Sequence, residues 1–134
     1  MSALFYFDTC LWIDYYEKRG IAGDLALKRI LHILSNNQTI LYSDLIIKEL
    51  KHLHYSSEEI MRLLATVKPN LRRVHIFKEQ IEHASVLTQQ RKIPKGDCLH
   101  AILARDNEAI LLSRDKDFEK LKDIVIVKRP HELT

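Results

Sequence analysis

The chain has 134 residues, of which 46% are hydrophobic and 29% are charged, and its formal net charge is +3. This length and apolar content suit one compact domain over residues 1–134 and leave no room for a second domain. So small a positive charge does not by itself identify an anionic partner, because many soluble proteins carry it and bind no nucleic acid.

The sequence lacks the features typical of membrane and disulfide-rich proteins. No apolar run approaches the ~20 residues that a membrane-spanning helix needs. The apolar start of the chain carries no basic leader and is interrupted by Asp8, so we interpret it as mature structure and not as a signal peptide. The two cysteines, Cys10 and Cys98, lie in apolar segments and imply no disulfide framework. We therefore expect a soluble, cytoplasmic protein without membrane contact.

Strand and helix patterns alternate along the first half of the chain. The short aromatic-rich run at residues 3–7 predicts a buried strand, and residues 39–42 predict a second one. Ser56 and Glu59 have the spacing of a capping box, which predicts a helix that begins there and ends before Pro69. Three other helices are expected in this half. The first covers residues 11–19, the second begins at a cap at Asp24 and ends at about residue 36, and the third covers residues 45–54.

The same alternation continues in the second half. Strands are expected over residues 73–77, 109–113 and 124–127, helices over residues 78–90, 97–104 and 116–122, and a loop over residues 91–96. The strands are short and nearly all apolar, which is typical of a parallel sheet that is buried on both faces. The sequence therefore predicts an α/β fold: a three-layer α/β/α sandwich with a central, mainly parallel sheet of about five strands.

Acidic residues follow the predicted strands. Asp8, Asp44 and Asp115 come just after strands, and Asp117 lies just beyond Asp115. In a sheet of this kind, ligands bind at the carboxyl ends of the strands. Because residues alternate along a strand, Ser113 and Asp115 point to the same side, where Ser113 can hydrogen-bond an acid or a metal-bound water.

Carboxylates that converge at one edge need a counter-charge. Two bare carboxylates ~4 Å apart repel each other by about 4 kcal/mol at an effective dielectric near 20. A divalent cation removes this repulsion, and ligands that are all oxygen select hard ions such as Mg²⁺ or Mn²⁺. The histidines and cysteines lack the paired spacing of a structural zinc site.

Each of these residues also has a simpler structural interpretation. Asp8 and Asp97 stand where helix N-caps are expected, and Asp117 can cap the short helix at residues 116–122. We interpret Asp44 as a cap and not as a ligand. His100 lies one turn past Asp97 on the same helical face, so it either hydrogen-bonds near the site or packs against the sheet as a structural histidine.

Four stretches together resemble the PIN domain, and by pattern the small toxin ribonucleases of VapBC toxin–antitoxin pairs: YFDTC, SDLIIKEL, KGDCLHAILA and LLSRDKDFEKL. The resemblance runs from Phe5 to about Leu121, and its last two stretches, in that order and spacing, are the more specific ones. It implies a metal-dependent endoribonuclease with Mg²⁺, or Mn²⁺, as cofactor. Carried over position by position, the acidic site of the family falls on four residues: Asp8, Glu49, Asp97 and Asp115.

The resemblance also implies roles for these positions. Asp8, Asp97 and Asp115 would hold a first ion, and Glu49 would hold a second ion or orient the attacking water. Supporting positions fall on Thr9, Ser113 and Asp117, and the basic residues that flank the acids are candidates for RNA phosphate contacts: Lys95, Arg114 and Lys116. The family pattern often has Ser or Asn at Cys10 and a small alanine at Cys98, and neither departure removes a metal ligand.

The implied function is hydrolysis of RNA phosphodiester bonds by the toxin of a toxin–antitoxin pair, with a small antitoxin protein as partner and a homodimer as assembly. Two alternatives remain open. One is a housekeeping RNA-processing PIN nuclease. The other is a non-catalytic module on the same fold that binds Mg²⁺ or another protein.

Overall fold

The computed structural model describes residues 3–132 and has a five-stranded parallel sheet at its centre. The strands are β1 (Leu4–Phe7), β2 (Thr39–Tyr42), β3 (Leu71–Arg73), β4 (Ile110–Leu112) and β5 (Val127–Lys128). They lie in the order β3-β2-β1-β4-β5, and every neighbouring pair is parallel. The helices are α1 (Thr9–Glu17), α2 (Gly20–Ser35), α3 (Asp44–His52), α4 (Ser57–Ala65), α5 (Lys78–Arg91) and α6 (Lys95–Asp106), with short 3₁₀ helices η1 (Lys116–Leu121) and η2 (Pro130–Glu132).

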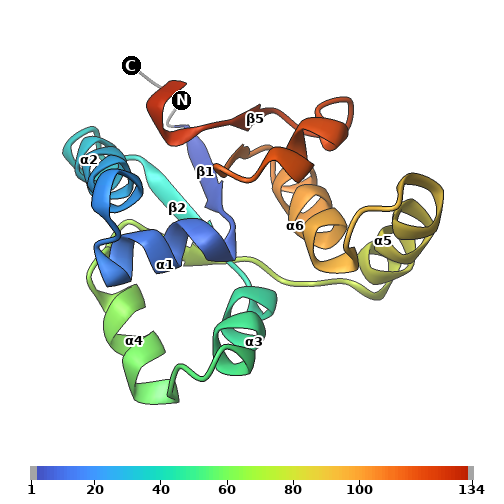
Figure 1. Cartoon of the computed structure of the whole chain (residues 1–134). Helices are drawn as coiled ribbons and strands as arrows, with labels where there is room; N and C mark the ends of the chain where they lie inside the picture. The colour runs from blue at the N-terminus through green and yellow to red at the C-terminus, as the bar shows by residue number, and fades with distance from the viewer. Residues whose placement is uncertain (1–2, 133–134) are drawn as a thin grey trace.

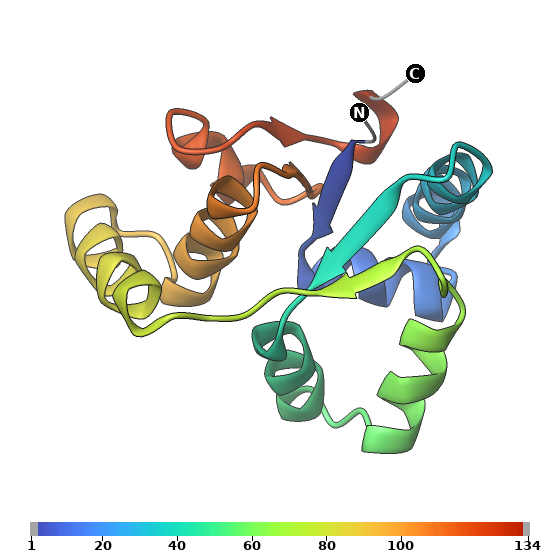
Figure 2. The same ribbon diagram turned by 180° about the vertical axis from the view of Figure 1, so that it is seen from behind.

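Helices cover both sides of this sheet, which confirms the predicted three-layer α/β fold. Helices α1 and α2 pack together on one side of β1 and β2, and α5 and α6 pack together on the other side (Figure 1). The view from behind shows the same arrangement (Figure 2). Within residues 3–132, no helix is long and apolar enough to cross a membrane.

The central strand β1 is apolar along its length because both of its faces are covered. Tyr6 and Phe7 are fully buried, and the Phe7 ring packs against Trp12 of α1 with ring centroids 5.2 Å apart. Such aromatic contacts bury a large apolar area and fix the helix on the sheet. The predicted capping box is also confirmed: Glu59 N donates to Ser56 Oγ, and Ser56 N donates to Glu59 Oε1.

Two strands lie elsewhere than predicted. The third strand was expected over residues 73–77, but β3 is Leu71–Arg73, because its ladder is set by the partner strand β2 and ends opposite Tyr42. The last strand was expected over residues 124–127, but β5 pairs only Val127 and Lys128 with β4. In both cases the apolar content pointed to the wrong residues, because edge strands are defined by their hydrogen-bonding partner.

Three helices begin at least two residues earlier than predicted: α2, α6, and α1, which begins at Thr9 and not at residue 11. Helix α2 begins at Gly20 and not at Asp24, because Lys18 already turns the chain in a left-handed conformation and α1 and α2 then meet closely at Gly23. A Cβ atom at Gly23 would lie 2.6 Å from the backbone of Lys18. The predicted loop at residues 91–96 is short, because α6 begins at Lys95, so Asp97 lies in the first turn of α6 and is not its N-cap.

Candidate active site

The candidate site lies where the strand order of the sheet reverses. Strand β1 pairs with β2 on one side and with β4 on the other, and the chain reaches β4 only after it has built β2 and β3. In open parallel sheets, ligands bind beyond the carboxyl ends of the strands at such a switch point. Asp8 directly follows β1, and Ser113 directly follows β4.

Ser113 joins the ends of these two strands. Its Oγ donates a hydrogen bond of 2.6 Å to Asp8 Oδ2 and accepts one of 2.9 Å from the backbone N–H of Asp115. The other oxygen of Asp8 accepts a hydrogen bond of 3.0 Å from the backbone N–H of Leu11, so Asp8 also caps α1. Asp8 is only 4% exposed, and both of its oxygens are held by the protein.

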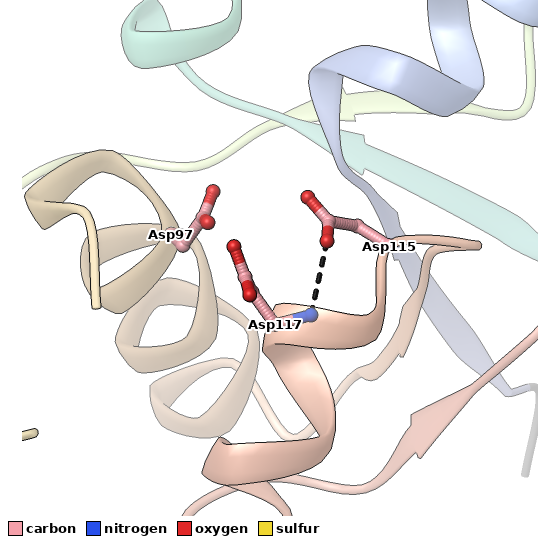
Figure 3. Close-up of side chains that lie close together, drawn as sticks. All are labelled: Asp97, Asp115 and Asp117. Atoms are coloured by element: carbon pink, nitrogen blue, oxygen red, sulfur yellow. Dashed lines mark hydrogen bonds between the residues drawn. The ribbon is translucent and has the colours of Figure 1, made fainter. Parts of the chain in front are cut away.

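Three carboxylates gather beside this junction (Figure 3). Asp97 comes from the first turn of α6, and Asp115 and Asp117 come from the start of η1. One oxygen of each carboxylate lies within 4.8 Å of the corresponding oxygens of the other two. The backbone N–H of Asp117 donates to Asp115 Oδ1 at 2.9 Å, and this turn places both side chains opposite Asp97.

This donor set fits a hard divalent cation. All three groups offer oxygen, which Mg²⁺ and Mn²⁺ prefer. Two oxygens bound to one Mg²⁺ at about 2.1 Å are at most about 4.2 Å apart, so the three carboxylates need only a small contraction. From the sequence we assigned Asp8 as a direct ligand and Asp117 as a supporting residue. In the structure Asp117 stands beside Asp97 and Asp115, and both assignments stay predictions.

Burial and mutual repulsion act on the acids of this site. Burial raises the pKa of Asp97 to about 7, and the negative charges of Asp115, Asp8 and Glu49 contribute to the rise. Burial also raises the pKa of Asp8 to about 6, against the effect of the hydrogen bond from Ser113. Carboxylates that are this costly to ionise together are the ones that a bound cation stabilises most.

Glu49 enters the site from α3. Its Oε1 accepts a hydrogen bond of 2.7 Å from His100 Nε2 and a second one from the hydroxyl of Thr9. Burial acts to raise the pKa of Glu49, but these two partners outweigh it and hold the pKa below its ordinary value. Its Oε2 lies beside Gly96, where a Cβ atom would be 2.6 Å away. His100 is 1% exposed, so it is both a buried histidine and a hydrogen-bond partner of the site.

The structure thus brings together the four acids that we singled out from the sequence: Asp8, Glu49, Asp97 and Asp115. The interpretation of Asp44 as a helix cap is wrong, because Ser43 is the N-cap of α3 and Asp44 is its first helical residue. The Asp44 carboxylate forms an ion pair with Arg73.

The three basic residues that we considered for RNA contacts differ in their surroundings. Lys95 and Lys116 are exposed. The guanidinium of Arg114 binds the carboxylate of Asp14, with 3.0 Å between Nη2 and Oδ1, and Asp14 is completely buried. Arg114 therefore holds the segment after β4 against α1.

An open cavity of about 840 Å³ adjoins Glu49. Its walls come mainly from α1, α3, α5 and α6 and are largely apolar, and Lys48, Lys51 and Lys95 add positive charge. Glu49 and Gly96 belong to its lining, so the cavity reaches the site from the side of α3.

Sequence reasoning missed two polar residues behind the site. Tyr6 Oη lies 2.7 Å from His100 Nδ1 and 2.8 Å from Ser43 Oγ. One signal was available: Tyr6 and Asp8 are two residues apart in an extended segment, so they point to the same face of the sheet. The partners of Tyr6 come from distant parts of the chain, and no local pattern identifies them.

Comparisons with known proteins agree with this fold. The model of the PIN domain family matches residues 5–124. No curated relative matches the chain. Among solved structures, VapBC2 from Rickettsia felis, bound to a promoter DNA fragment, is similar with a TM-score of 0.70 and 18% identity over 94% of this chain and 98% of that chain.

Two further structures have the same fold. VapBC-1 from nontypeable Haemophilus influenzae has a TM-score of 0.68 and 18% identity over 96% of this chain and 98% of that one. A toxin–antitoxin complex from Klebsiella pneumoniae has a TM-score of 0.66 and 22% identity over 96% of this chain and 98% of that one. At these identities the structures establish the fold alone. Because the family model spans residues 5–124, most of the chain, the protein belongs to the PIN domain family.

Proposed function

We propose that this protein is a metal-dependent endoribonuclease that hydrolyses RNA phosphodiester bonds and acts as the toxin of a toxin–antitoxin pair. The observation that carries the proposal is the group of acids at the β1–β4 switch point, in which Asp97, Asp115 and Asp117 offer three oxygens within 4.8 Å of one another. The family resemblance selects RNA as substrate and hydrolysis as reaction.

The residues divide into those that hold the cation and those that prepare the water. Asp97 and Asp115, with Asp117 or Asp8, would hold Mg²⁺ or Mn²⁺. When bound, the ion would lower the pKa of a water molecule and neutralise negative charge on the scissile phosphate. Glu49 is ionised and has Oε1 engaged by His100 and Thr9, so Oε2 is the oxygen that accepts a hydrogen bond from the attacking water or joins a second ion.

The cavity beside Glu49 suits an RNA strand. Its apolar walls can contact bases, and the ammonium groups of Lys48, Lys51 and Lys95 can contact phosphates. Lys116 is exposed next to the acids and would take the neighbouring phosphate. Arg114 would contribute to RNA binding only by giving up part of its ion pair with Asp14.

The proposal includes the partners that the resemblance implies. A small antitoxin protein would bind and silence the nuclease, and two copies of the chain would pair as a homodimer. The similar solved structures named above include toxin–antitoxin complexes, which supports the first of these. Action on cellular RNA would place the protein in the cytoplasm.

Cleavage of end-labelled RNA tests the reaction. The purified protein should cut single-stranded RNA with Mg²⁺ or Mn²⁺, leave matched DNA intact, and stop in EDTA. Asp97→Asn should abolish cleavage, while Asp24→Asn, which alters an exposed acid on α2, should not. Full cleavage in EDTA would overturn the metal-dependent reaction.

Expression in a bacterial host distinguishes the toxin from the two alternatives. A toxin should arrest growth when expressed alone, and co-expression of the small protein encoded beside it should restore growth. A processing nuclease would cleave RNA in vitro without arrest. A non-catalytic module would bind Mn²⁺ and cleave nothing.

A further inference from the structure

A chain of buried polar groups runs from the interior of the sheet to Glu49. Ser43 Oγ lies 2.8 Å from Tyr6 Oη, Tyr6 Oη lies 2.7 Å from His100 Nδ1, and His100 Nε2 lies 2.7 Å from Glu49 Oε1. Ser43 and Tyr6 are completely buried, and His100 is 1% exposed. The four residues come from β1, the start of α3, α3 itself and α6, so only the folded chain assembles them.

The direction of these hydrogen bonds follows from their chemistry. The ionised carboxylate of Glu49 can only accept, so His100 must carry a proton on Nε2. On a neutral imidazole Nδ1 is then an acceptor, and the Tyr6 hydroxyl donates to it. Tyr6 Oη in turn accepts from Ser43. Each of these four side chains therefore has a hydrogen-bond partner, as buried polar groups require.

These contacts leave the Glu49 carboxylate one orientation. Oε1 accepts hydrogen bonds from His100 and Thr9, which leaves Oε2 facing Gly96 and the cavity. The absence of a side chain at Gly96 is necessary for this placement, because a Cβ atom there would lie 2.6 Å from Oε2. A glutamate on a helix is otherwise free to sample several rotamers. Here two hydrogen bonds restrict its conformational freedom before any substrate binds, which is the condition for preorganised catalysis.

We propose that His100, held in its Nε2–H tautomer by Tyr6 and Ser43, is a positioning residue that fixes Glu49 with Oε2 presented to the attacking water or a second ion. This inference rests on the proposed nuclease function for its effect on rate. The hydrogen-bond geometry itself does not depend on that function. The competing view is that His100 only fills space in the core.

Variants of His100 separate these views. His100→Gln keeps an N–H donor near the position of Nε2, whereas His100→Leu keeps the volume without a donor. Positioning predicts that His100→Leu lowers kcat by about 10-fold to 100-fold, the usual effect of losing such a supporting contact, with KM for RNA within about 3-fold. His100→Gln should recover most of the loss. His32→Leu, at an exposed histidine of α2, is the matched control.

A double-mutant cycle with Glu49→Gln shows whether the effect passes through Glu49. In the Glu49→Gln background, His100→Leu should cause no further loss of kcat. Equal losses in both backgrounds, or failure of His100→Gln to recover kcat in a folded protein, would overturn the proposal. Tyr6→Phe removes the hydroxyl that hydrogen-bonds His100 Nδ1. It should lower kcat by about 3-fold to 10-fold, less than His100→Leu.

A measurement independent of RNA cleavage completes the test. The ¹⁵N chemical shifts of the His100 ring should show the Nε2–H tautomer in the unmodified protein and a tautomer mixture in Glu49→Gln. An Nδ1–H tautomer in the unmodified protein would overturn the positioning role. If the protein cleaves no RNA, the proposed function fails, and the His100 tautomer still decides whether Glu49 is held as described.

Discussion

Ser113 and Asp8 are joined by a hydrogen bond of 2.6 Å, although they are 105 residues apart in the chain. This bond connects the carboxyl ends of β1 and β4, and through the backbone N–H of Asp115 it also anchors the segment that carries Asp115 and Asp117. The placement of Asp115 and Asp117 next to Asp8 therefore depends on one buried hydroxyl group.

Ser113→Ala should weaken this site more than the fold. Asp8 loses a donor to its ionised form, and Asp115 N loses its acceptor, a change of about 1–3 kcal/mol in stability. We expect RNA cleavage to fall by about 10-fold to 100-fold and the melting temperature to fall by several degrees. Ser57→Ala, at the exposed start of α4, should change neither. Unchanged cleavage in Ser113→Ala would show that the hydroxyl does not organise the cluster.

The stability of the metal-free protein should depend on pH, because two buried acids of the site are costly to ionise. Since folding raises the pKa of Asp8 from 3.8 to about 6 and that of Asp97 from 3.8 to about 7, the folded state binds more protons than the unfolded state between these values. Below about pH 4 these two acids therefore do not change the free energy of unfolding with pH. From about pH 4 to about pH 7 they lower it increasingly, so the folded state becomes less stable. For Asp8, the difference corresponds to at most about 3 kcal/mol.

Urea denaturation in EDTA at pH 5 and pH 8 measures this effect. The unmodified protein should be less stable at pH 8, Mg²⁺ should restore stability at pH 8, and Asp97→Asn should reduce both changes. Glu49 acts in the opposite direction, because folding lowers its pKa. Its stabilising contribution is present at both pH 5 and pH 8 and is lost only at lower pH. A metal-free protein that gains stability steadily from pH 5 to pH 8 would contradict the raised pKa values of Asp8 and Asp97.

Gly96→Ala should separate activity from stability. The new Cβ atom would lie 2.6 Å from Glu49 Oε2, so the Glu49 side chain must move away from its partners. In a helix, alanine is otherwise favoured over glycine by about 0.5–1 kcal/mol. We expect RNA cleavage to fall by about 10-fold or more while the melting temperature changes little. A variant that cleaves normally would show that the orientation of Glu49 is unimportant.

The fold could be predicted from the sequence because its signals are local. The apolar runs at residues 4–7 and 39–42 and the capping box at Ser56 each depend on neighbouring residues only. The edge strands β3 and β5 were misplaced because their bounds are set by hydrogen bonds to β2 and β4. Amino-acid type alone does not reveal those partners.

The site could be predicted only in part, because some of its contacts join residues that are far apart in the sequence. Asp8 and Asp115 were recognisable because each follows a strand, whereas Glu49 was identified by its match to a family pattern. Tyr6 forms hydrogen bonds with His100, 94 residues away in the sequence, and with Ser43, 37 residues away, and the ion pair of Arg114 with Asp14 spans 100 residues. Such contacts become visible only when the chain is folded.

Arg114 and Lys116 should respond differently to substitution. Arg114→Ala leaves the buried carboxylate of Asp14 with only Arg19, 4.0 Å away, so the protein should lose about 1–3 kcal/mol of stability after allowance for the exposure of Arg114. Lys116→Ala should leave the melting temperature unchanged and raise KM for RNA by about 3-fold to 10-fold through one lost phosphate contact. Thermal melting and steady-state cleavage measure both, and a stable Arg114→Ala protein would contradict the structural role.

The central claim is that carboxylates from distant parts of the chain meet around one hard divalent cation. A crystal soaked in Mn²⁺ and measured at a wavelength where manganese scatters anomalously tests it most directly. The account predicts an anomalous peak within coordination distance of Asp97 and Asp115, with Asp117 or Asp8 as a further ligand, and no such peak in crystals of Asp97→Asn. A fully soaked crystal without a peak between these carboxylates would contradict it.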